Sequence, residues 1–99
     1  MNIIVCGAGR VGYSIAKQLS AQGHSITVID QSSEDIQKIN ESIDVKGIVG
    51  SGTYPSVLEK AGAKEADMII AVTKSDEVNM IVCQIAHSIF NVTKKIARI

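Results

Sequence analysis

Residues 3–12 of the chain read Ile3-Ile4-Val5-Cys6-Gly7-Ala8-Gly9-Arg10-Val11-Gly12, an apolar run followed by glycines in the spacing G-x-G-x-x-G. A strand that ends in such a turn and continues into a helix is typical of a dinucleotide-binding βαβ unit. Gly7 lets the chain turn, Gly9 lets a pyrophosphate approach the backbone, and Gly12 lets the helix pack closely on the strand. We expect the phosphates to lie against backbone N–H groups at the N-terminus of that helix.

The segment that follows the glycines predicts a helix and then a second strand. Apolar residues recur at spacings of three and four, at Tyr13, Ile15, Ala16 and Leu19, so one face of the helix is buried against a sheet. Gly23 is expected to cap this helix, and the run 26–29 predicts a buried strand that ends at Asp30. Asp30 then lies beside the glycine loop, where its carboxylate can accept both ribose hydroxyls and repel a 2′-phosphate. This favours NAD(H), or a nucleotide with free ribose hydroxyls such as ATP or ADP, over NADP.

Two structural alternatives to this interpretation remain. A glycine-rich turn can belong to an α/β protein that binds nothing, although here the preceding strand, the following helix and the acid roughly 20 residues later all fit a nucleotide site. Asp30 can also be the N-cap of the next helix. However, Ser32 and Ser33 can fill that capping role, with Glu34 and Asp35 in the first turn.

Composition limits the class of protein. A chain of 99 residues has room for one domain, and its 45% hydrophobic content is enough for a packed α/β core. The net charge is zero and no block of Lys and Arg occurs, so nothing indicates binding to nucleic acid or to a lipid surface. The sequence has no apolar segment of bilayer length and begins directly before a core strand, so we expect a cytosolic protein without a signal peptide.

The cysteines and histidines suggest no chemistry. We interpret Cys6 and Cys83 as small buried apolar residues rather than disulfide or metal partners. His24 is expected in a loop and His87 within a helix without a spaced Cys, His or acid, so neither is favoured as a metal ligand or a catalytic group.

The remaining sequence continues the alternation of helix and strand without a linker. We expect three further helices, over 33–42, 55–61 and 76–90, and three further strands, over 45–49, 68–72 and 95–99. In the first of these helices Ile36, Ile39 and Ile43 are expected to point inward, and Gly62 is expected to end the second. This pattern predicts a Rossmann-like, doubly wound parallel α/β sheet in the order 3-2-1-4-5 with helices on both faces.

The predicted strand order places the ligand crevice between the first and fourth strands. The segment after Val72 then faces the ligand, so Thr73 can bond a ribose or phosphate oxygen and Lys74 can approach through its backbone. Alternatively, Thr73 and Ser75 cap the long helix, and the acids at 76 and 77 favour its positive end. Capping and ligand contact can coexist.

Two arginines are candidates for phosphate contacts. A guanidinium at Arg10 opposes the dipole of the helix that it begins, and a bound phosphate would remove that penalty through bidentate pairing. The alternative is a solvated or intersubunit arginine. Arg98, between Ala97 and Ile99 in an apolar strand, is expected to point away from the core or toward the mouth of the crevice, where it would contact a ligand or a partner.

The order of these motifs resembles the N-terminal nucleotide-binding domains of the Trk potassium uptake proteins, the RCK or KTN domain family, over essentially the whole chain. The resemblance rests on the segments 7–12, 28–30, 50–53 with Leu58 and Ala61-Gly62, 71–79 and 96–98. It implies a cytoplasmic regulatory subunit, not an enzyme, that binds NAD(H) or adenine nucleotides. It further implies a homodimer or larger ring that gates an integral-membrane potassium transporter at the inner face of the membrane.

The resemblance also assigns site residues. In that family the nucleotide is held by the positions that match Gly7, Ala8, Gly9, Arg10, Val11, Asp30, Thr73, Lys74 and Arg98. Ser51 departs from the family pattern, which usually has Asp near the adenine, so base selectivity is expected to be altered. The family's domain continues past Ile99 with another strand and helix, so we expect this chain to be a fragment with incomplete oligomer surfaces.

Two other functions compete with this interpretation. One is the cofactor-binding half of an NAD-dependent dehydrogenase, although no residue is a persuasive general acid or base near a nicotinamide. The other is an interaction module whose nucleotide site has decayed, against which the intact glycines and Asp30 argue. Our mechanistic hypothesis is that different nucleotides favour different arrangements of paired domains through unequal affinity.

Overall fold

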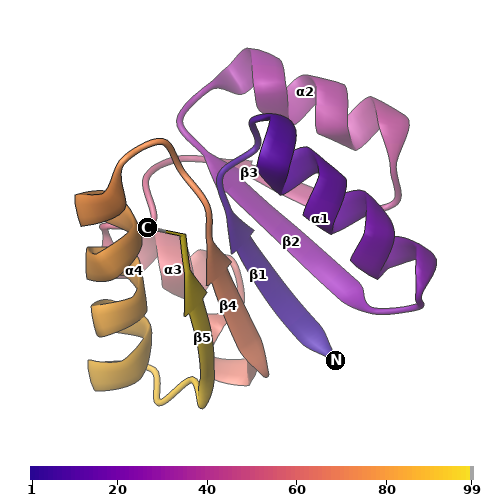
Figure 1. The fold of residues 1–99 in the computed structure, drawn as a ribbon. Helices are drawn as coiled ribbons and strands as arrows, with labels where there is room; N and C mark the ends of the chain where they lie inside the picture. The colour runs from indigo at the N-terminus through magenta and orange to yellow at the C-terminus, as the bar shows by residue number, and fades with distance from the viewer. Residues whose placement is uncertain (99) are drawn as a thin grey trace.

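A five-stranded parallel sheet in the order β3-β2-β1-β4-β5 forms the centre of the computed structural model, which describes residues 1–98 (Figure 1). The strands are β1 (Asn2–Cys6), β2 (Ser25–Asp30), β3 (Lys46–Val49), β4 (Met68–Ala71) and β5 (Lys94–Ala97). The helices are α1 (Arg10–Ala21), α2 (Ser33–Ser42), α3 (Pro55–Lys60), the short 3₁₀ helix η1 (Ala63–Glu65) and α4 (Asp76–Ser88). The predicted Rossmann-like α/β fold and strand order are confirmed.

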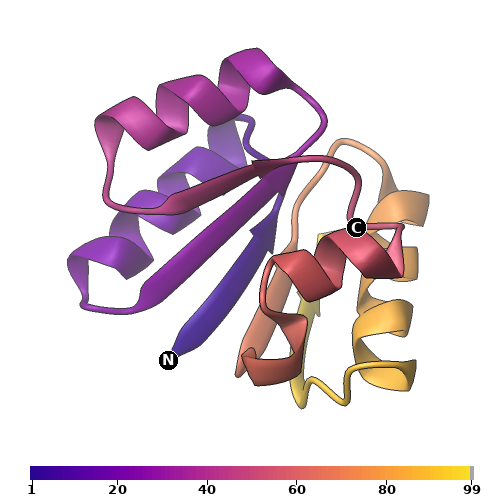
Figure 2. The same ribbon diagram turned by 180° about the vertical axis from the view of Figure 1, so that it is seen from behind.

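Helices cover both faces of the sheet, as Figures 1 and 2 show from opposite sides. Successive residues of a strand point to opposite faces, so β1 supplies both layers of the core. Ile3 and Val5 pack with residues of α1 and α2, whereas Ile4 and Cys6 pack with residues of α3 and α4. This burial on both faces explains why the strands read as nearly continuous apolar runs.

Parallel pairing brings several loops to one edge of the sheet. β1 pairs with β2 and β4, and the pairing continues beyond the strands because Gly7 N donates to Ile29 O at 2.8 Å and Val72 N donates to Cys6 O at 2.8 Å. Since the loops after β1, β2 and β4 all start at this carboxyl edge, the chain gathers polar residues there from distant segments.

The helix ends follow local sequence rules. Ser32 and Ser75 are the N-caps of α2 and α4, and each hydroxyl accepts a hydrogen bond from a first-turn N–H. Gly23 and Gly62 each have φ near 91°, a left-handed conformation that permits the chain to turn after α1 and α3. Gln22, rather than the predicted Gly23, is the C-cap residue of α1, and Gly23 forms the turn directly after it.

The predicted boundaries shift by one or two residues. β3 begins at Lys46 rather than 45, β4 ends at Ala71 rather than 72, and α4 ends at Ser88 rather than 90. α3 ends at Lys60, with Ala61 as its C-cap, and η1 was not expected. These ends depend on ladder hydrogen bonds and caps, which apolar periodicity does not specify.

The fifth strand begins one residue earlier than predicted, at Lys94, and ends at Ala97; the expected end of this strand at Ile99 lies outside the described residues. Cys6 is buried as expected, but Cys83 is only half-buried because it lies on the flank of α4 rather than on its core face. Within residues 1–98, none of the helices has the length and apolar character required to span a bilayer.

Candidate functional site

The glycine loop joins β1 to α1 through contacts that other residues would obstruct. Gly7 has φ 118°, and a Cβ at this position would lie 2.8 Å from the carbonyl oxygen of Val72. A Cβ at Gly12 would lie 1.7 Å from the carbonyl oxygen of Gly7. The turn and the close packing expected of these glycines are therefore confirmed.

Gly9 has a different role in this loop. A Cβ at Gly9 would meet no atom within 4 Å, so the space beside it is open. Gly9 is also the N-cap of α1, and no side chain bonds the first N–H groups of this helix. These N–H groups remain available to an anion at the positive end of the helix dipole.

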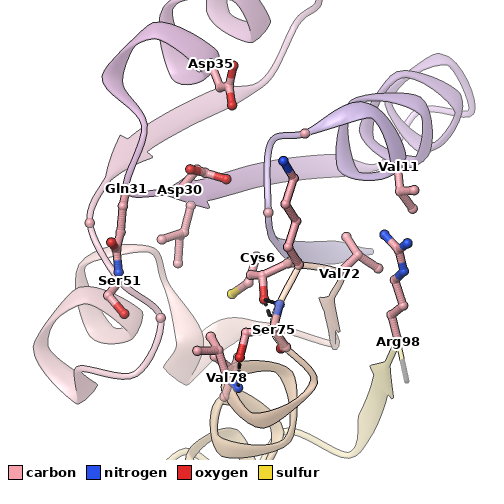
Figure 3. Close-up of a pocket in the computed structure, with 18 of the residues that line it drawn as sticks. Cys6, Val11, Asp30, Gln31, Asp35, Ser51, Val72, Ser75, Val78 and Arg98 are labelled. Carbon is pink, nitrogen blue, oxygen red and sulfur yellow. Dashed lines mark hydrogen bonds between the residues drawn. The ribbon is translucent and has the colours of Figure 1, made fainter.

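A cavity of about 800 Å³ lies at the carboxyl edge of the sheet, beside the glycine loop. Its wall contains eight of the nine predicted site residues, namely Gly7, Gly9, Arg10, Val11, Asp30, Thr73, Lys74 and Arg98. These residues come from the first turn of α1 and from the segments at the ends of β1, β2, β4 and β5. Figure 3 shows this for the labelled Val11, Asp30 and Arg98. The ninth, Ala8, is buried and does not line the cavity.

Ala8 contributes through its backbone. The N–H of Ala8 donates to Asp30 Oδ2 at 2.7 Å, and the N–H of Ser32 donates to Asp30 Oδ1 at 2.8 Å. The Asp30 carboxylate thus ties the glycine loop to the turn before α2. Because each carboxylate oxygen has further lone pairs, the half-buried group can still accept hydrogen bonds from the cavity.

The capping alternative for Asp30 is not supported. Ser32 is the N-cap of α2, and its Oγ accepts from the N–H of Asp35 at 3.2 Å. Asp35 itself lines the cavity on the same side as Asp30. Two carboxylates therefore lie at this end of the cavity, where they oppose an additional phosphate on a ribose.

The turn after β4 combines capping with access to the cavity. Ser75 caps α4, since its Oγ accepts from the N–H of Val78 at 3.2 Å. Thr73 Oγ1 lies 2.7 Å from Asn79 Oδ1 and accepts from the N–H of Ser75 at 3.2 Å. The acids at 76 and 77 are in the first turn of α4 and are not part of the cavity wall, so they fit the capping interpretation.

Both arginines belong to the cavity wall. Arg10 is the first residue of α1, and Arg98 directly follows β5. Figure 3 shows the Arg98 side chain extending toward Val11, at the start of α1. Within the described chain the salt bridge is Lys64–Glu59, at 3.7 Å, so neither arginine has a carboxylate partner there. The cavity is therefore cationic toward α1 and β5 and anionic toward α2.

Sequence reasoning missed the apolar wall of the cavity. This wall consists of Cys6, Ile29, Val72, Val78 and Val82. Gly52 allows the loop after β3 to approach it, because a Cβ there would lie 3.0 Å from Cys6 Sγ and from a methyl carbon of Val82. The glycines at 50 and 52 were a sequence signal that the loop after β3 approaches other atoms closely. Val78 and Val82, in contrast, have the pattern of residues in the buried core of a helix.

Cys6 acts as an apolar member of this wall. The pKa of the Cys6 thiol is raised from 9.0 to about 12, mainly by burial and to a smaller extent by the nearby Cys83 and Asp30. Burial also raises the pKa of Cys83, against the opposing effect of Lys95. Both thiols are protonated at neutral pH, so they are poor nucleophiles.

Ser51 lines the cavity where the resemblance predicts an acid. Its Oγ lies 2.7 Å from Thr53 Oγ1 and accepts from the N–H of Thr53 at 3.2 Å. A neutral hydroxyl therefore replaces a charge on this part of the wall.

The sequence matches the model of a known domain family. The model of the TrkA-N domain matches residues 3–99. This chain belongs to the TrkA-N domain family. Relatives include the Trk system potassium uptake protein TrkA of Azorhizobium caulinodans, at 48% identity over 99 residues, and that of Halomonas elongata, at 46%. The chain is covered completely in both matches but spans only 22% of the length of each relative.

Solved structures share the fold of this TrkA-N domain. The AMP-bound Kef CTD of Shewanella denitrificans has a TM-score of 0.80 at 28% identity, over 97% of this chain and 57% of the other. The GsuK channel bound to NAD also has a TM-score of 0.80, at 22% identity, over 94% of this chain and 17% of the channel. At 22% identity, the similarity to the GsuK channel shows a shared fold only. The same fold occurs in the NAD-bound enzyme WbmG of Bordetella bronchiseptica, with a TM-score of 0.73.

Proposed function

We propose that this TrkA-N domain binds NAD(H), or ATP or ADP, at the carboxyl edge of its sheet and acts as the nucleotide sensor of a longer potassium-uptake protein. The observation that carries the proposal is a single cavity that joins the uncapped N-terminus of α1, the Asp30 carboxylate and the turn after β4. The names of the relatives support the link to potassium uptake, and the AMP and NAD in similar structures support the ligand class.

The charge distribution of the cavity suggests how the ligand lies. Phosphates fit the cationic side, between the first N–H groups of α1, Arg10 and Arg98. A ribose fits the side of Asp30, whose free lone pairs accept its hydroxyls. The base then lies against the apolar wall near Ser51. In this arrangement Gly7, Gly9, Val11, Thr73 and Lys74 contact the ligand, and Ala8 acts through Asp30.

The wider role of the protein follows from this assignment. We assign residues 1–99 to one domain that works as a homodimer or larger ring, bound at the inner face of the membrane to an integral-membrane potassium transporter. Different nucleotides gate the transporter because they bind two arrangements of the paired domains with unequal affinity. Arg10 and Arg98, which have no carboxylate partner within residues 1–98, favour such ligand-dependent contacts.

An enzymatic role has less support. Hydride transfer usually requires a general acid or base near the nicotinamide. His24 lies 3.1 Å from the amino group of Met1, at the opposite edge of the sheet, and His87 is exposed on α4. Neither histidine is part of the cavity wall. A dehydrogenase half would need its acid or base from another domain.

Calorimetric titration of the chain with NADH, NAD⁺, ATP, ADP and NADPH tests the ligand. We expect binding of at least one ligand with free ribose hydroxyls and exclusion of NADPH. Arg10→Ala should weaken binding about tenfold to a hundredfold, the value of charge-assisted hydrogen bonds. Lys17→Ala, an exposed cation on the same helix, is the matched control and should change nothing. A folded chain that binds none of the five ligands would refute the proposal.

Asp30 requires a stability measurement beside the titration. Asp30→Ala removes the ribose acceptor and also frees the N–H groups of Ala8 and Ser32, so it should lower both affinity and stability. Asp44→Ala is the control, because Asp44 is an exposed acid outside the cavity. Retention of NADH affinity in a folded Asp30→Ala chain would contradict the assigned ribose contact.

The gating step needs the longer protein. Solution scattering of the full-length protein with NADH, NAD⁺, ATP and ADP should give at least two distinct profiles if the ligands favour different arrangements. Four identical profiles would contradict the population-shift mechanism while leaving nucleotide binding in place.

A further inference from the structure

Asn79 is a polar side chain in the core whose role the nucleotide site does not explain. It lies in the first turns of α4 with 0% of its surface exposed, and it is not part of the cavity wall. Burying an amide without hydrogen bonds would cost about 1–3 kcal/mol. An apolar residue would be sufficient for packing at this position, so the amide indicates a role that depends on its hydrogen bonds.

The amide of Asn79 makes four hydrogen bonds to two segments. Its Oδ1 accepts from the N–H of Thr73 at 2.9 Å and from Thr73 Oγ1 at 2.7 Å. Its Nδ2 donates to the carbonyl oxygens of Thr73, at 3.2 Å, and of Arg98, at 3.0 Å. Two acceptor sites and two donor hydrogens are the whole capacity of an amide side chain, so Asn79 is fully used within the protein.

These bonds fix two parts of the cavity wall to one point in α4. Thr73 is held at its N–H, its carbonyl and its hydroxyl. Arg98 is held on both sides, because its N–H donates to Ala71 O at 2.9 Å while its carbonyl accepts from Asn79. The exposed Arg98 side chain therefore extends toward the start of α1 from an anchored backbone (Figure 3).

Asn79 also sets the hydrogen-bonding polarity of Thr73. A hydroxyl has one proton and two lone pairs. Two acceptors lie within reach of the proton of Thr73 Oγ1, namely Asn79 Oδ1 at 2.7 Å and the carbonyl oxygen of Ser75 at 3.2 Å, and we assign the proton to the shorter bond. One lone pair of Oγ1 receives the N–H of Ser75. The remaining lone pair can accept a hydrogen bond from a ligand hydroxyl, but no proton is left for a phosphate oxygen.

We propose that Asn79 is a positioning residue that holds the Thr73 turn and Arg98 in register and orients the Thr73 hydroxyl as an acceptor for a ligand hydroxyl. The proposal rests on the proposed function, because it presupposes a ligand in the cavity. In this proposal Asn79 contributes to the affinity for the ligand without touching the ligand.

The test compares Asn79→Ala with a matched control in the same helix. Ala86→Gly also lies on the buried face of α4, away from the cavity, and destabilises the chain by loosening the helix. Urea unfolding measures the stability of each variant, and titration with NADH measures affinity. We expect Asn79→Ala to weaken NADH binding about tenfold, while Ala86→Gly leaves affinity unchanged.

A double-mutant cycle with Arg98→Ala separates positioning from general loosening. If Asn79 acts through Arg98, the effect of Asn79→Ala on NADH affinity should become much smaller in the Arg98→Ala background. Equal loss of affinity in Asn79→Ala and Ala86→Gly, or full additivity with Arg98→Ala, would overturn the proposal.

The wild-type chain provides a second measurement if Asn79→Ala does not fold. The amide of Thr73, bonded to Asn79, should be protected from hydrogen exchange to the same order as that of Val72, which is bonded to Cys6 O. Exchange of Thr73 at the rate of an open loop would overturn the positioning role. Failure of the wild-type chain to bind NADH, NAD⁺, ATP or ADP would instead refute the proposed function on which this role rests.

Discussion

At the scale of single residues, Gly9 and Gly12 of the glycine loop differ in the space that surrounds them. Gly12 faces the carbonyl of Gly7 with no room for a methyl group, whereas Gly9 faces open space with an ordinary φ of −72°. The same substitution should therefore affect folding at one position and ligand binding at the other.

We expect Gly12→Ala to cost about 3 kcal/mol of stability, because the obstructing atom is backbone and cannot rotate away. Gly9→Ala should cost less than about 1 kcal/mol but weaken NADH binding about tenfold, since the new methyl occupies the approach of the phosphates. Urea unfolding and calorimetry on both variants measure these effects. Equal stability of the two variants would contradict the packing argument.

The buried thiol of Cys6 predicts a loss of stability in alkaline solution. The unfolded chain releases this proton above about pH 9, whereas the folded chain retains it until about pH 12. Below pH 9 both states bind the proton, so stability is unaffected; from 9 to 12 the free energy of unfolding should fall by about 1 kcal/mol per pH unit.

Urea unfolding at pH 7, 9 and 10 in the presence of a reductant measures this dependence. Cys6→Ala should make the decrease in the free energy of unfolding above pH 9 less steep. Cys83→Ala should flatten it less, because Cys83 is half-buried and Lys95 opposes the effect of burial on its pKa. An unchanged slope in Cys6→Ala would show that the Cys6 thiol does not titrate as argued.

At the scale of elements, the three long helices begin in two ways. α2 and α4 begin at serine hydroxyls that accept first-turn N–H groups, whereas α1 begins at a glycine without any side-chain cap. A serine at the start of α1 would occupy the N–H groups that a phosphate needs. The difference between the helices follows from the place of α1 at the cavity.

We expect Ser32→Ala and Ser75→Ala each to lower the free energy of unfolding by about 1 kcal/mol, because each leaves a first-turn N–H without its acceptor. Ser75→Asp should restore most of the loss, since aspartate caps equally well. Chemical denaturation of the three variants provides the measurement. Full stability of Ser75→Ala would mean that water replaces the cap without cost.

At the scale of the whole molecule, ligand binding and folding are coupled. A ligand that binds only the folded chain stabilises it by about 2.7 kcal/mol at a hundred times its Kd. In a domain of this size that corresponds to an increase of about 10 °C or more in Tm. We expect NADH or ADP to produce this increase and NADPH to produce none.

Thermal unfolding with each nucleotide measures the shift, and Asp30→Ala should reduce it. An equal shift with NADPH would indicate that the carboxylates of Asp30 and Asp35 do not select against a 2′-phosphate.

The sequence was sufficient to predict the fold and most of the charged residues of the cavity wall. Apolar runs gave the strands, the spacing of apolar residues gave the helices, and right-handed crossovers fixed the strand order. Because parallel strands all end at one edge, the residues after β1, β2, β4 and β5 had to meet there, including Arg98. These features depend on local patterns and on general rules of chain connection.

The tertiary structure alone decided how the polar groups pair. Ala8 donates to Asp30 across 22 positions, and Asn79 donates to Arg98 across 19. It likewise decided that Val78 and Val82 face the cavity and that Cys83 is only half-buried. Such contacts depend on distances and directions between segments far apart in the chain, which hydrophobic periodicity does not encode. The physical reason is that a helical pattern fixes which face of α4 is buried, whereas only packing fixes which atoms that face meets.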